Sequence, residues 1–402
     1  MHSTAAAGGG TDSLRTGNLS RVLTLLHRRG PISRANLTRL TGFNRSTVGA
    51  LVTELAAMDL VYETEPPSGR VGRPSPLVHA NERTAAVVVH PDVDAVTVGL
   101  VGLGGRVHRR VRHETAAPPT VAETVSITRA VLAGMAPDLA AMDRLAGVGA
   151  AVPGLTRTSD GSVLLAPHLG WRNEPLAEPL AEALGLPVSA GNDATLGSVA
   201  ESLFGAAVDA TDAVYLNGSA SGIGGGIISA GRPLRGADGY AGELGHTLVN
   251  SDGASCHCGR RGCLETEVSL SRLLQVLGLD RADQDTLDAA MAAPQDPSLA
   301  AEVERQLDHL AVALTNFVNI FNPETIVLGG FLGTLFASAP ERLTDAVGAD
   351  AVAGLGRRVV LRRAALRSEL LLVGAAELAF APILAAPAHA LPDVVPEAEA
   401  AG

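Results

Sequence analysis

Lysine is absent from this chain of 402 residues, and all 31 basic residues are arginine. Aromatic residues make up only 3% of the chain, so a core has to be built mainly from alanine, valine and leucine. Cysteine is scarce too: there are three, and the first ten residues contain no apolar segment of the kind that a signal peptide has. These absences favour a protein with reduced thiols in the cytoplasm.

A long uninterrupted apolar run is missing as well. The most apolar stretch, residues 370–388, is broken by Glu377, Pro382 and Pro387. A helix that spans a membrane needs about 20 consecutive apolar residues. We therefore expect a buried helix at about 372–385 and no association with a membrane. A chain of this length is expected to form two or three domains.

Charge is distributed unevenly along the chain. Residues 1–80 contain nine arginines and five acidic residues, whereas the remainder contains 22 arginines and 37 acidic residues. A basic head on an acidic body indicates that only the head meets a polyanion such as DNA.

Residues 15–80 predict a winged helix-turn-helix domain. Apolar residues at helical spacing predict three short helices, over 19–29, 33–40 and 44–58, with glycine turns between them. A strand at 61–63, a tip at 68–74 and a second strand at 77–78 would form the wing. The alternative is a small helical bundle with an ordinary hairpin. The residues expected to contact DNA are Asn44, Arg45, Ser46 and Thr47 at the start of the third helix, and Arg70 and Arg73 in the tip.

The body alternates strands with helices, which predicts an α/β fold. A set of antiparallel strands, followed by a helix and a parallel strand, begins at about residue 85 and again at about residue 213. This repetition indicates two related lobes with a cleft between them. We expect the glycine-rich stretch 217–226 to be a loop, and the polar residues at strand ends, Asn192 and Asp193, to face the cleft.

All three cysteines, Cys256, Cys258 and Cys263, lie within eight residues, and His246 precedes the first of them by ten. Three thiolates and an imidazole can supply four ligands to a tetrahedral Zn²⁺. Buried free thiols are the alternative, since a disulfide between Cys256 and Cys258 would be strained. Glu243 and Glu265 flank these residues and could instead be solvated carboxylates, just as Asp193 could simply cap a helix.

Several motifs together resemble the ROK family (repressors, open reading frames and sugar kinases), from about Leu19 to Pro382. The resemblance implies an actin-like (ribonuclease H-like), two-lobed sugar-kinase fold behind the winged helix-turn-helix. The lobes would be 84–195, completed by the helix at about 372–385, and 196–370 with the zinc site. The tails, 1–14 and 386–402, would be disordered. The motifs are Ala241–His246, Cys256–Glu265, Gly191–Ala194, the glycine-rich stretch 218–226 and, for the repressor branch of the xylose-repressor and N-acetylglucosamine-repressor type, Val71–Ser75.

The resemblance also implies ligands and site residues. The metal would be a structural Zn²⁺ held by His246, Cys256, Cys258 and Cys263. In a kinase, Asp193 would be the catalytic base. His168 stands where the family often has an asparagine that touches the sugar. Paired donors and acceptors suit sugar hydroxyls, and the residues implied to bind a sugar are Gly154, His168, Asn192, Asp193, Glu243, His246 and Glu265.

One departure from the family pattern argues against an enzyme. Kinases of the family carry Asp-x-Gly-x-Thr after the first strand, where this chain has His90-Pro91-Asp92-Val93-Asp94. Two carboxylates at that place would repel a triphosphate. We therefore predict a sugar-responsive transcriptional regulator, of the repressor type, that binds operator DNA as a homodimer or homotetramer.

Two other functions stay open at this point. One is an ATP-dependent sugar kinase of the glucokinase or N-acetylhexosamine kinase type with an added DNA-binding domain. The other is a DNA-binding protein, stabilised by zinc, that responds to a partner protein and not to a sugar.

Overall fold

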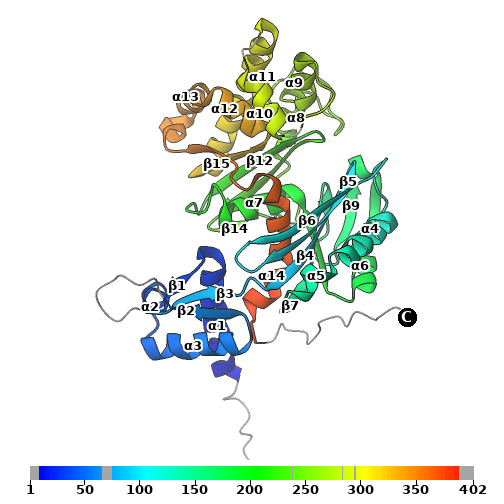
Figure 1. The fold of residues 1–402 in the computed structure, drawn as a ribbon. Coiled ribbons are helices and arrows are strands. Elements are labelled where there is room, and N and C mark those ends of the chain that lie inside the picture. The colour runs from blue at the N-terminus through cyan, green and yellow to red at the C-terminus, as the bar shows by residue number, and fades with distance from the viewer. Residues whose placement is uncertain (1–8, 66–74, 238, 283, 294–295, 389–402) are drawn as a thin grey trace, which may run out of the picture. The chain divides into compact units, whose positions relative to one another are not determined.

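The computed structural model describes residues 9–65, 75–237, 239–282, 284–293 and 296–388 (Figure 1). Contacts divide the chain into two compact units. Unit 1 is Met1–Val152, Thr158–Gly191 and Ala375–Gly402, and unit 2 is Pro153–Arg157 and Asn192–Gly374.

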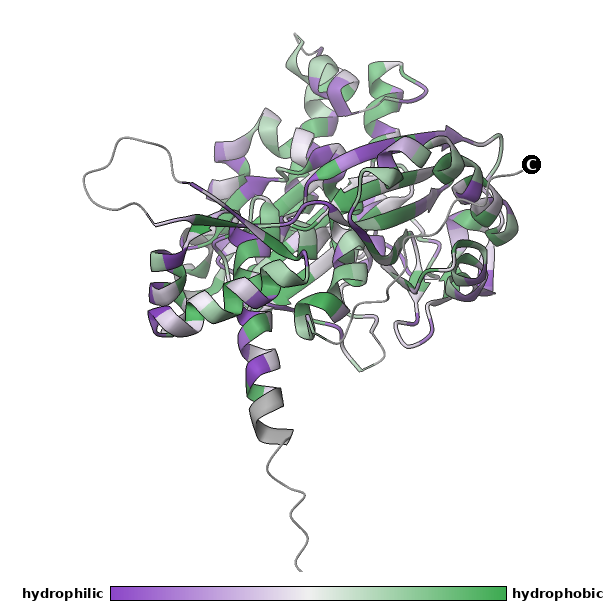
Figure 2. Ribbon diagram, turned by 60° about the horizontal axis from the view of Figure 1, so that its bottom comes forward, coloured by the Kyte–Doolittle hydropathy of each residue, from purple (hydrophilic) through white to green (hydrophobic). Residues whose placement is uncertain are grey.

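The head, residues 9–80, belongs to unit 1 and has the helices and strands expected of a winged helix-turn-helix. Ser33 caps α2 through a hydrogen bond from the backbone of Asn36, and Gly42 ends that helix in the left-handed conformation (φ 72°). The helices alternate between hydrophobic and hydrophilic residues, as expected where one face is buried (Figure 2). The elements are α1 (Gly9–Arg29), β1 (Ile32–Ser33), α2 (Arg34–Thr41), α3 (Arg45–Ala57), β2 (Val61–Thr64) and β3 (Leu77–Ala80), with the strands in the order β1-β3-β2.

Helix α1 is longer than the apolar spacing predicted. It begins at Gly9, so residues 9–14 are helical and our expectation of a disordered tail up to residue 14 was wrong for them. Arg15 donates two hydrogen bonds to one carboxylate oxygen of Glu54 on α3, at 3.0 and 2.8 Å. Apolar periodicity does not reveal the polar start of this helix, and the exposed ion pair ties the next residues of α1 to α3.

The main sheet of unit 1 has five strands in the order β11-β7-β4-β5-β6. The strands are β4 (Thr84–Asp92), β5 (Ala95–Gly102), β6 (Val107–Glu114), β7 (Arg144–Val152) and β11 (Val188–Asn192). The helices with them are α4 (Val121–Gly134), α5 (Ala136–Ala140), α6 (Ala177–Leu184) and the C-terminal α14 (Leu370–Ala385). A hairpin that the sequence did not reveal consists of β9 (Ser162–Ala166), η1 (Pro167–Leu169) and β10 (Trp171–Pro175), next to β8 (Leu155–Thr156).

Small residues allow α14 to lie directly on this sheet. A Cβ atom on Gly149 of β7 would be 1.9 Å from the carbonyl oxygen of Ala375 in α14. By length and composition, Arg367–Ala385 is a helix that could cross a membrane. Here, however, its apolar side chains pack inside the protein: Leu372, Val373, Ala375, Ala376, Ala379, Phe380 and Ile383 are buried.

The main sheet of unit 2 also has five strands, in the order β14-β13-β12-β15-β16. Its strands are β12 (Ala213–Ser219), β13 (Gly222–Ser229), β14 (Arg232–Pro233), β15 (Thr325–Gly330) and β16 (Val360–Arg363). The other elements are α7 (Asp193–Phe204), η2 (Leu244–His246), α8 (Leu264–Glu267), α9 (Leu270–Leu277), α10 (Gln284–Ala292), α11 (Pro297–Phe321), α12 (Phe331–Ser338), α13 (Pro340–Asp350), η3 (Val352–Arg357) and η4 (Arg367–Glu369).

The glycine-rich stretch 217–226 is strand and not loop, which corrects our expectation. β12 and β13 pair as far as Ser219 and Gly222, so only Ala220 and Ser221 form the turn. The glycines serve packing: a Cβ on Gly224 would be 2.7 Å from Cβ of Ala194 in α7. Glycine in this strand therefore lets a helix lie close to the sheet.

The two main sheets share one strand order. Counted along the chain within each sheet, both run third, second, first, fourth, fifth. In both, the first and second strands are antiparallel and the first and fourth are parallel. The repetition seen in the sequence therefore corresponds to two lobes of the same topology.

Candidate functional site

Four side chains able to bind a metal converge in unit 2, along the segment from η2 to α8. Ligand atoms of His246, Cys256, Cys258 and Cys263 all lie within 4.8 Å of one another. Nδ1 of His246 is 3.6 Å from Sγ of Cys256, and Sγ of Cys258 is 3.7 Å from Sγ of Cys263. A tetrahedral ion with bonds of about 2.3 Å to sulfur separates its ligands by about 3.8 Å. The four side chains can therefore hold a metal ion.

The backbone of this loop fixes the ligands in place. The N–H of Cys256 donates to the carbonyl oxygen of Arg260 at 2.8 Å, which closes the turn that starts at the first cysteine and contains the second. Gly262 has φ 69°, and a Cβ there would be 1.5 Å from the carbonyl oxygen of Asn250. Only glycine suits this position, next to the buried Cys263.

Glu267 also organises the loop, although the sequence analysis did not identify it. Its side chain accepts hydrogen bonds from the backbone of Ala254 at 2.8 Å and from Asn250 Nδ2 at 3.3 Å. The residue is only 4% exposed. The sequence did contain a sign of this role, namely the spacing of Glu267 from Glu265. Two residues apart on α8, the two carboxylates point in roughly opposite directions. One can therefore hold the loop while the other faces the candidate metal ligands.

The thiols differ in how easily they ionise. A hydrogen bond from the backbone N–H of Arg260 lowers the pKa of Cys258. Burial raises the pKa of Cys263. It also raises the pKa of Cys256, together with the hydrogen bond from its thiol to Glu265. Because a bound cation deprotonates the thiols that coordinate it, the buried pair would become thiolates only with the metal in place.

Glu265 lies against the metal ligands. Its Oε1 is 2.9 Å from Sγ of Cys256, 3.3 Å from Nδ1 of His246 and 3.2 Å from Nδ1 of His257. The Glu265 side chain is 9% exposed. It is therefore not a solvated surface carboxylate, which was the alternative left open by the sequence.

Glu243 begins the same segment, just before η2. Although the residue is exposed, the atoms packed around its carboxyl group partly desolvate it and raise its pKa. The charge of His246 opposes this shift, and that of Glu265 adds to it. Glu243, His246 and Glu265 thus form one electrostatic group beside the cysteines.

Asn192, Asp193 and Gly154 form a second polar group in unit 2. Asn192 Oδ1 accepts the N–H of Thr195 and so caps α7, while its Nδ2 donates to the carbonyl oxygen of Gly154 at 3.1 Å. Asp193 Oδ1 accepts the N–H of Ala194 at 2.7 Å. The helix cap that we considered for Asp193 is supplied instead by Asn192.

Strand β13 lies between these two groups. Near its start, a Cβ on Gly222 would be 2.5 Å from Oε2 of Glu265, and one on Gly224 would meet Ala194 beside Asp193. Six of the seven expected sugar-binding residues thus belong to the two polar groups, and each group lies next to a glycine of this strand. The seventh, His168, is an exposed residue on η1 of unit 1.

The segment 90–94 forms the end of the β4–β5 hairpin in unit 1. Asp92 Oδ1 accepts the N–H of Val93 at 2.8 Å. Asp94 is paired with Arg112 on β6, at 2.7 Å. The ion pair offsets the charge of Asp94, so the repulsion that we expected from two carboxylates rests mainly on Asp92.

In the head, the first turn of α3 is accessible. Asn44, Arg45 and Ser46 are exposed, and Thr47 is half-buried. Asn44 Oδ1 accepts the N–H of Thr47 and the hydroxyl of Ser46, both at 2.8 Å, so this oxygen caps the helix. Arg70 and Arg73, the residues expected in the wing tip, lie outside the described residues.

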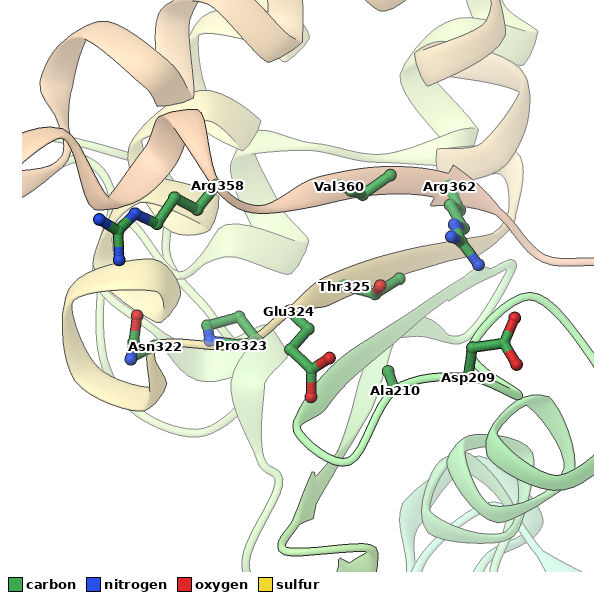
Figure 3. Close-up of a pocket in the computed structure, with 9 residues that line it drawn as sticks. All are labelled: Asp209, Ala210, Asn322, Pro323, Glu324, Thr325, Arg358, Val360 and Arg362. Carbon is green, nitrogen blue, oxygen red and sulfur yellow. The ribbon is translucent and has the colours of Figure 1, made fainter.

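A pocket of about 410 Å³ lies elsewhere in unit 2, at the amino-terminal ends of β15 and β16 (Figure 3). Ligands of α/β proteins bind at the opposite, carboxyl ends of the strands. Glu324 at its edge accepts hydrogen bonds from Thr211, which lower the pKa of its carboxyl group. None of the expected sugar-binding residues lines this pocket, which is formed by Asp209, Ala210, Asn322, Pro323, Glu324, Thr325, Arg358, Val360 and Arg362.

Two five-stranded sheets have the same strand order, and the four side chains that could hold a metal lie in the second unit, outside its sheet. Together these features define an α/β protein of the two-lobed, sugar-kinase-like class with an N-terminal extension. Residues 92–381 match the model of the ROK family. The chain belongs to the ROK family, as its motifs predicted.

Known proteins similar to the chain include regulators and enzymes. The xylose repressor of Bacillus subtilis (strain 168) is 31% identical over 321 residues, which cover 77% of this chain and 81% of the repressor. A solved ROK family transcriptional regulator, a homologue of the E. coli MLC protein, has a TM-score of 0.75 and 25% identity, covering 93% of this chain and 97% of the regulator. A ROK family glucokinase from Streptomyces griseus, solved with glucose and AMPPNP, has a TM-score of 0.60 and 27% identity, covering 73% of this chain and 98% of the enzyme.

Proposed function

We propose that this protein is a sugar-responsive transcriptional regulator of the repressor type, active in the cytoplasm, that controls genes of carbohydrate uptake or catabolism. The observation that carries the proposal is a helix-turn-helix with an exposed first turn on α3, joined to a ROK body. The relatives named as a repressor and a transcriptional regulator support it, since the match to the regulator covers 93% of this chain, whereas that to the glucokinase covers 73%.

Operator DNA would be bound by the head as part of a homodimer or homotetramer. The exposed residues at the start of α3 suit contacts in the major groove, and Arg70 and Arg73 would reach the minor groove from the wing. The arginine excess of residues 1–80 favours a polyanion.

A DNA-binding test can use the full-length protein and a random DNA library. We expect selection of one inverted-repeat sequence, and Arg45→Ala to weaken binding to it by about 1–3 kcal/mol, the usual contribution of an arginine that contacts a base. Arg129→Ala on α4 changes the charge equally, at an exposed position of the body, and should bind as the wild type does. If no sequence is enriched, the chain is not a DNA-binding regulator.

The effector would be a sugar or sugar derivative bound in unit 2. Gly154, Asn192, Asp193, Glu243, His246 and Glu265 would supply donors and acceptors for its hydroxyls, and His168 would add a contact if the ligand also reaches unit 1. Closure of the two lobes on the ligand would reorient the heads and change the half-site spacing that they can reach.

The metal would be a structural Zn²⁺ held by His246, Cys256, Cys258 and Cys263, the donor set typical of such sites. The ion would supply order to the loop and take no part in a reaction. Nδ1 of His246 faces Cys256, so the other ring nitrogen could form a hydrogen bond with a sugar hydroxyl.

A sugar kinase is the rival function, favoured by the similarity to the Streptomyces griseus glucokinase. The purified protein should show no hexose phosphorylation with ATP and Mg²⁺ at an ordinary enzymatic rate. Its melting temperature should nevertheless rise with at least one of D-xylose, D-glucose and N-acetyl-D-glucosamine, and Asp193→Asn should abolish that rise. Phosphorylation would favour the kinase, and no shift with any sugar would favour a regulator that responds to a partner protein.

A further inference from the structure

His27, in the last turn of α1, is a fully buried histidine in the head. Buried polar groups need hydrogen-bond partners, and both ring nitrogens have one from outside the head. The N–H of Gly104, in the β5–β6 turn, lies 2.9 Å from Nδ1, and Oε1 of Glu377 on α14 lies 2.9 Å from Nε2. The ring also packs edge-on against Phe380, with centroids 5.7 Å apart.

The chemistry of these partners fixes the direction of each hydrogen bond. A backbone N–H can only donate, so Nδ1 of His27 must accept from Gly104. The proton therefore sits on Nε2, which donates to the carboxylate of Glu377. One imidazole in this tautomer joins three elements of unit 1: α1, the β5–β6 turn and α14.

A second buried polar residue joins the head to the rest of unit 1, near the end of α3. Asn81, which is 9% exposed, donates through Nδ2 to the carbonyl oxygen of Asp59 at 2.7 Å and to Oδ2 of Asp143 at 3.0 Å. Asp59 lies two residues after the end of α3 and has φ 56°, while Asp143 lies just before β7. Asn81 thus links the turn that follows the helix proposed to enter the DNA to the residue that precedes β7 of the main sheet.

We infer that His27, in the DNA-binding head, and Asn81, just after it, are positioning residues that fix the orientation of α3 relative to the rest of unit 1. Apolar contacts tolerate sliding, whereas buried hydrogen bonds are directional and are lost on small rotations. A dimer can distinguish half-site spacings only if its two heads are held in a defined orientation. The inference rests on the proposed function, because it concerns how the head presents α3 to an operator.

Helix α14 links this arrangement to the proposed regulation. The helix starts at Leu370 in unit 2 and continues from Ala375 into unit 1, where it carries Glu377. The hydrogen bond to His27 therefore connects the head to a helix that is covalently continuous with the unit proposed to bind the sugar. A movement of α14 would be passed directly to α1.

The test uses full-length protein and the DNA sequence that the wild type selects. Affinity is measured for a single half-site, and for inverted repeats whose half-sites are kept at the selected spacing or moved apart by part of a helical turn. For Glu377→Ala and for Asn81→Ala, we expect half-site affinity close to that of the wild type. We expect the preference for the selected spacing to fall about tenfold, as loss of a hydrogen bond to a charged group would give.

Two further variants serve as controls. Glu377→Gln keeps an oxygen that can accept from His27 and should retain most of the spacing preference. Glu369→Ala, at an exposed position just before α14, changes the net charge as Glu377→Ala does and should behave as the wild type.

Three results would overturn the inference. An unchanged spacing preference in Glu377→Ala and Asn81→Ala would show that these contacts do not set the orientation of the head. Loss of half-site affinity in Glu377→Ala, which lies outside the head, would show that the contact maintains the fold of the head instead. If the wild type itself selects no DNA, the proposed function fails before any variant is compared, and the inference fails with it.

Discussion

The first hairpins of the two sheets occupy the same place in the same topology, yet they end in different chemistry. In unit 1, β4 and β5 are joined through Val93 and Asp94, with Asp92 at the end of β4. In unit 2, β12 and β13 are joined through Ala220 and Ser221, and the hydroxyls of Ser219 and Ser221 are 2.8 Å apart. One turn is acidic and the other is neutral and rich in hydroxyl groups.

This difference shows that a repeated topology constrains the backbone much more than the side chains at its turns. The unit 1 hairpin has its carboxylates tied into local contacts, with Arg112 and with the backbone of Val93. Unit 2 instead has the metal-ligand loop and two polar groups around β13. The two units also differ in what each adds to its sheet: unit 1 carries the head, and unit 2 carries the proposed metal and sugar sites.

The largest effect expected from this comparison follows removal of the metal. Cys258→Ser should lower metal affinity by more than the 10–100-fold that loss of an outer-shell partner costs. In hydrogen exchange, protection should fall in residues 244–267 and in β13, while β4 and β7 should remain protected. The response to sugar should be lost with the metal, because the loop holds both Glu243 and Glu265.

Treatment of the wild type with a chelator is the matching control, since it removes the ion without a substitution. Equal loss of protection in both sheets would show that the metal stabilises the whole chain. Loss of metal with sugar binding intact would show that the proposed metal and sugar sites are independent of each other.

A smaller effect should follow from filling the close contacts between helix and sheet in each unit. Gly149→Ala in unit 1 would place Cβ 1.9 Å from the backbone of α14, and Gly226→Ala in unit 2 would place it 2.4 Å from the Ser198 hydroxyl. Both substitutions overpack the interior and should cost about 1–3 kcal/mol of unfolding free energy. Gly149→Ala should cost more, because a backbone carbonyl cannot rotate away as a side chain can.

Denaturant unfolding measures both variants, and Gly134→Ala provides the control. Gly134 lies in α4, and a Cβ atom added there would meet no neighbouring atom within 4 Å. Alanine at this position should therefore be neutral or should stabilise by up to about 1 kcal/mol. Similar costs for Gly149→Ala and for Gly134→Ala would contradict the tight packing of α14 on β7.

The smallest effect should come from the acidic hairpin itself. Asp94 and Arg112 are 55% and 36% exposed, so their ion pair is solvated. Asp94→Ala should therefore change the unfolding free energy by less than about 1 kcal/mol, as measured by denaturant unfolding. A larger loss would mean that the fold of the hairpin requires the Asp94 carboxylate. The difference between this acidic turn and the neutral turn of unit 2 would then have a structural cause.

Much of the fold could be predicted because local sequence patterns mark where helices begin and which of their faces are buried. The caps at Ser33 and Asn44 mark the starts of α2 and α3, and the apolar positions Val48, Leu51, Val52 and Leu55 are all buried on one face of α3. The cluster of side chains that could hold a metal was predictable for a similar reason, since three of the four lie within eight residues. The family was predictable from its motifs, and the match over residues 92–381 confirms it.

Features that depend on partners far away in the sequence could not be read in advance. Arg15 of α1 pairs with Glu54 of α3, 39 residues away. The glycines of β13 resembled a loop because glycine usually marks turns, but here they accommodate α7. Arg363 on β16 donates to Asp288 on α10, 75 residues away.

By itself, the sequence determined the α/β class, the short helices of the head, the cluster of candidate metal ligands and the family, because each depends on residues close together in the chain or on a recognisable motif. Only the tertiary structure decided that Asn192 and not Asp193 caps α7, that Arg112 offsets the charge of Asp94, and that Glu267 fastens the loop. It alone brought His27 to Glu377, 350 residues away. Hydrogen bonds and ion pairs act over a few ångströms, so only the folded chain can show which distant residues come within that reach.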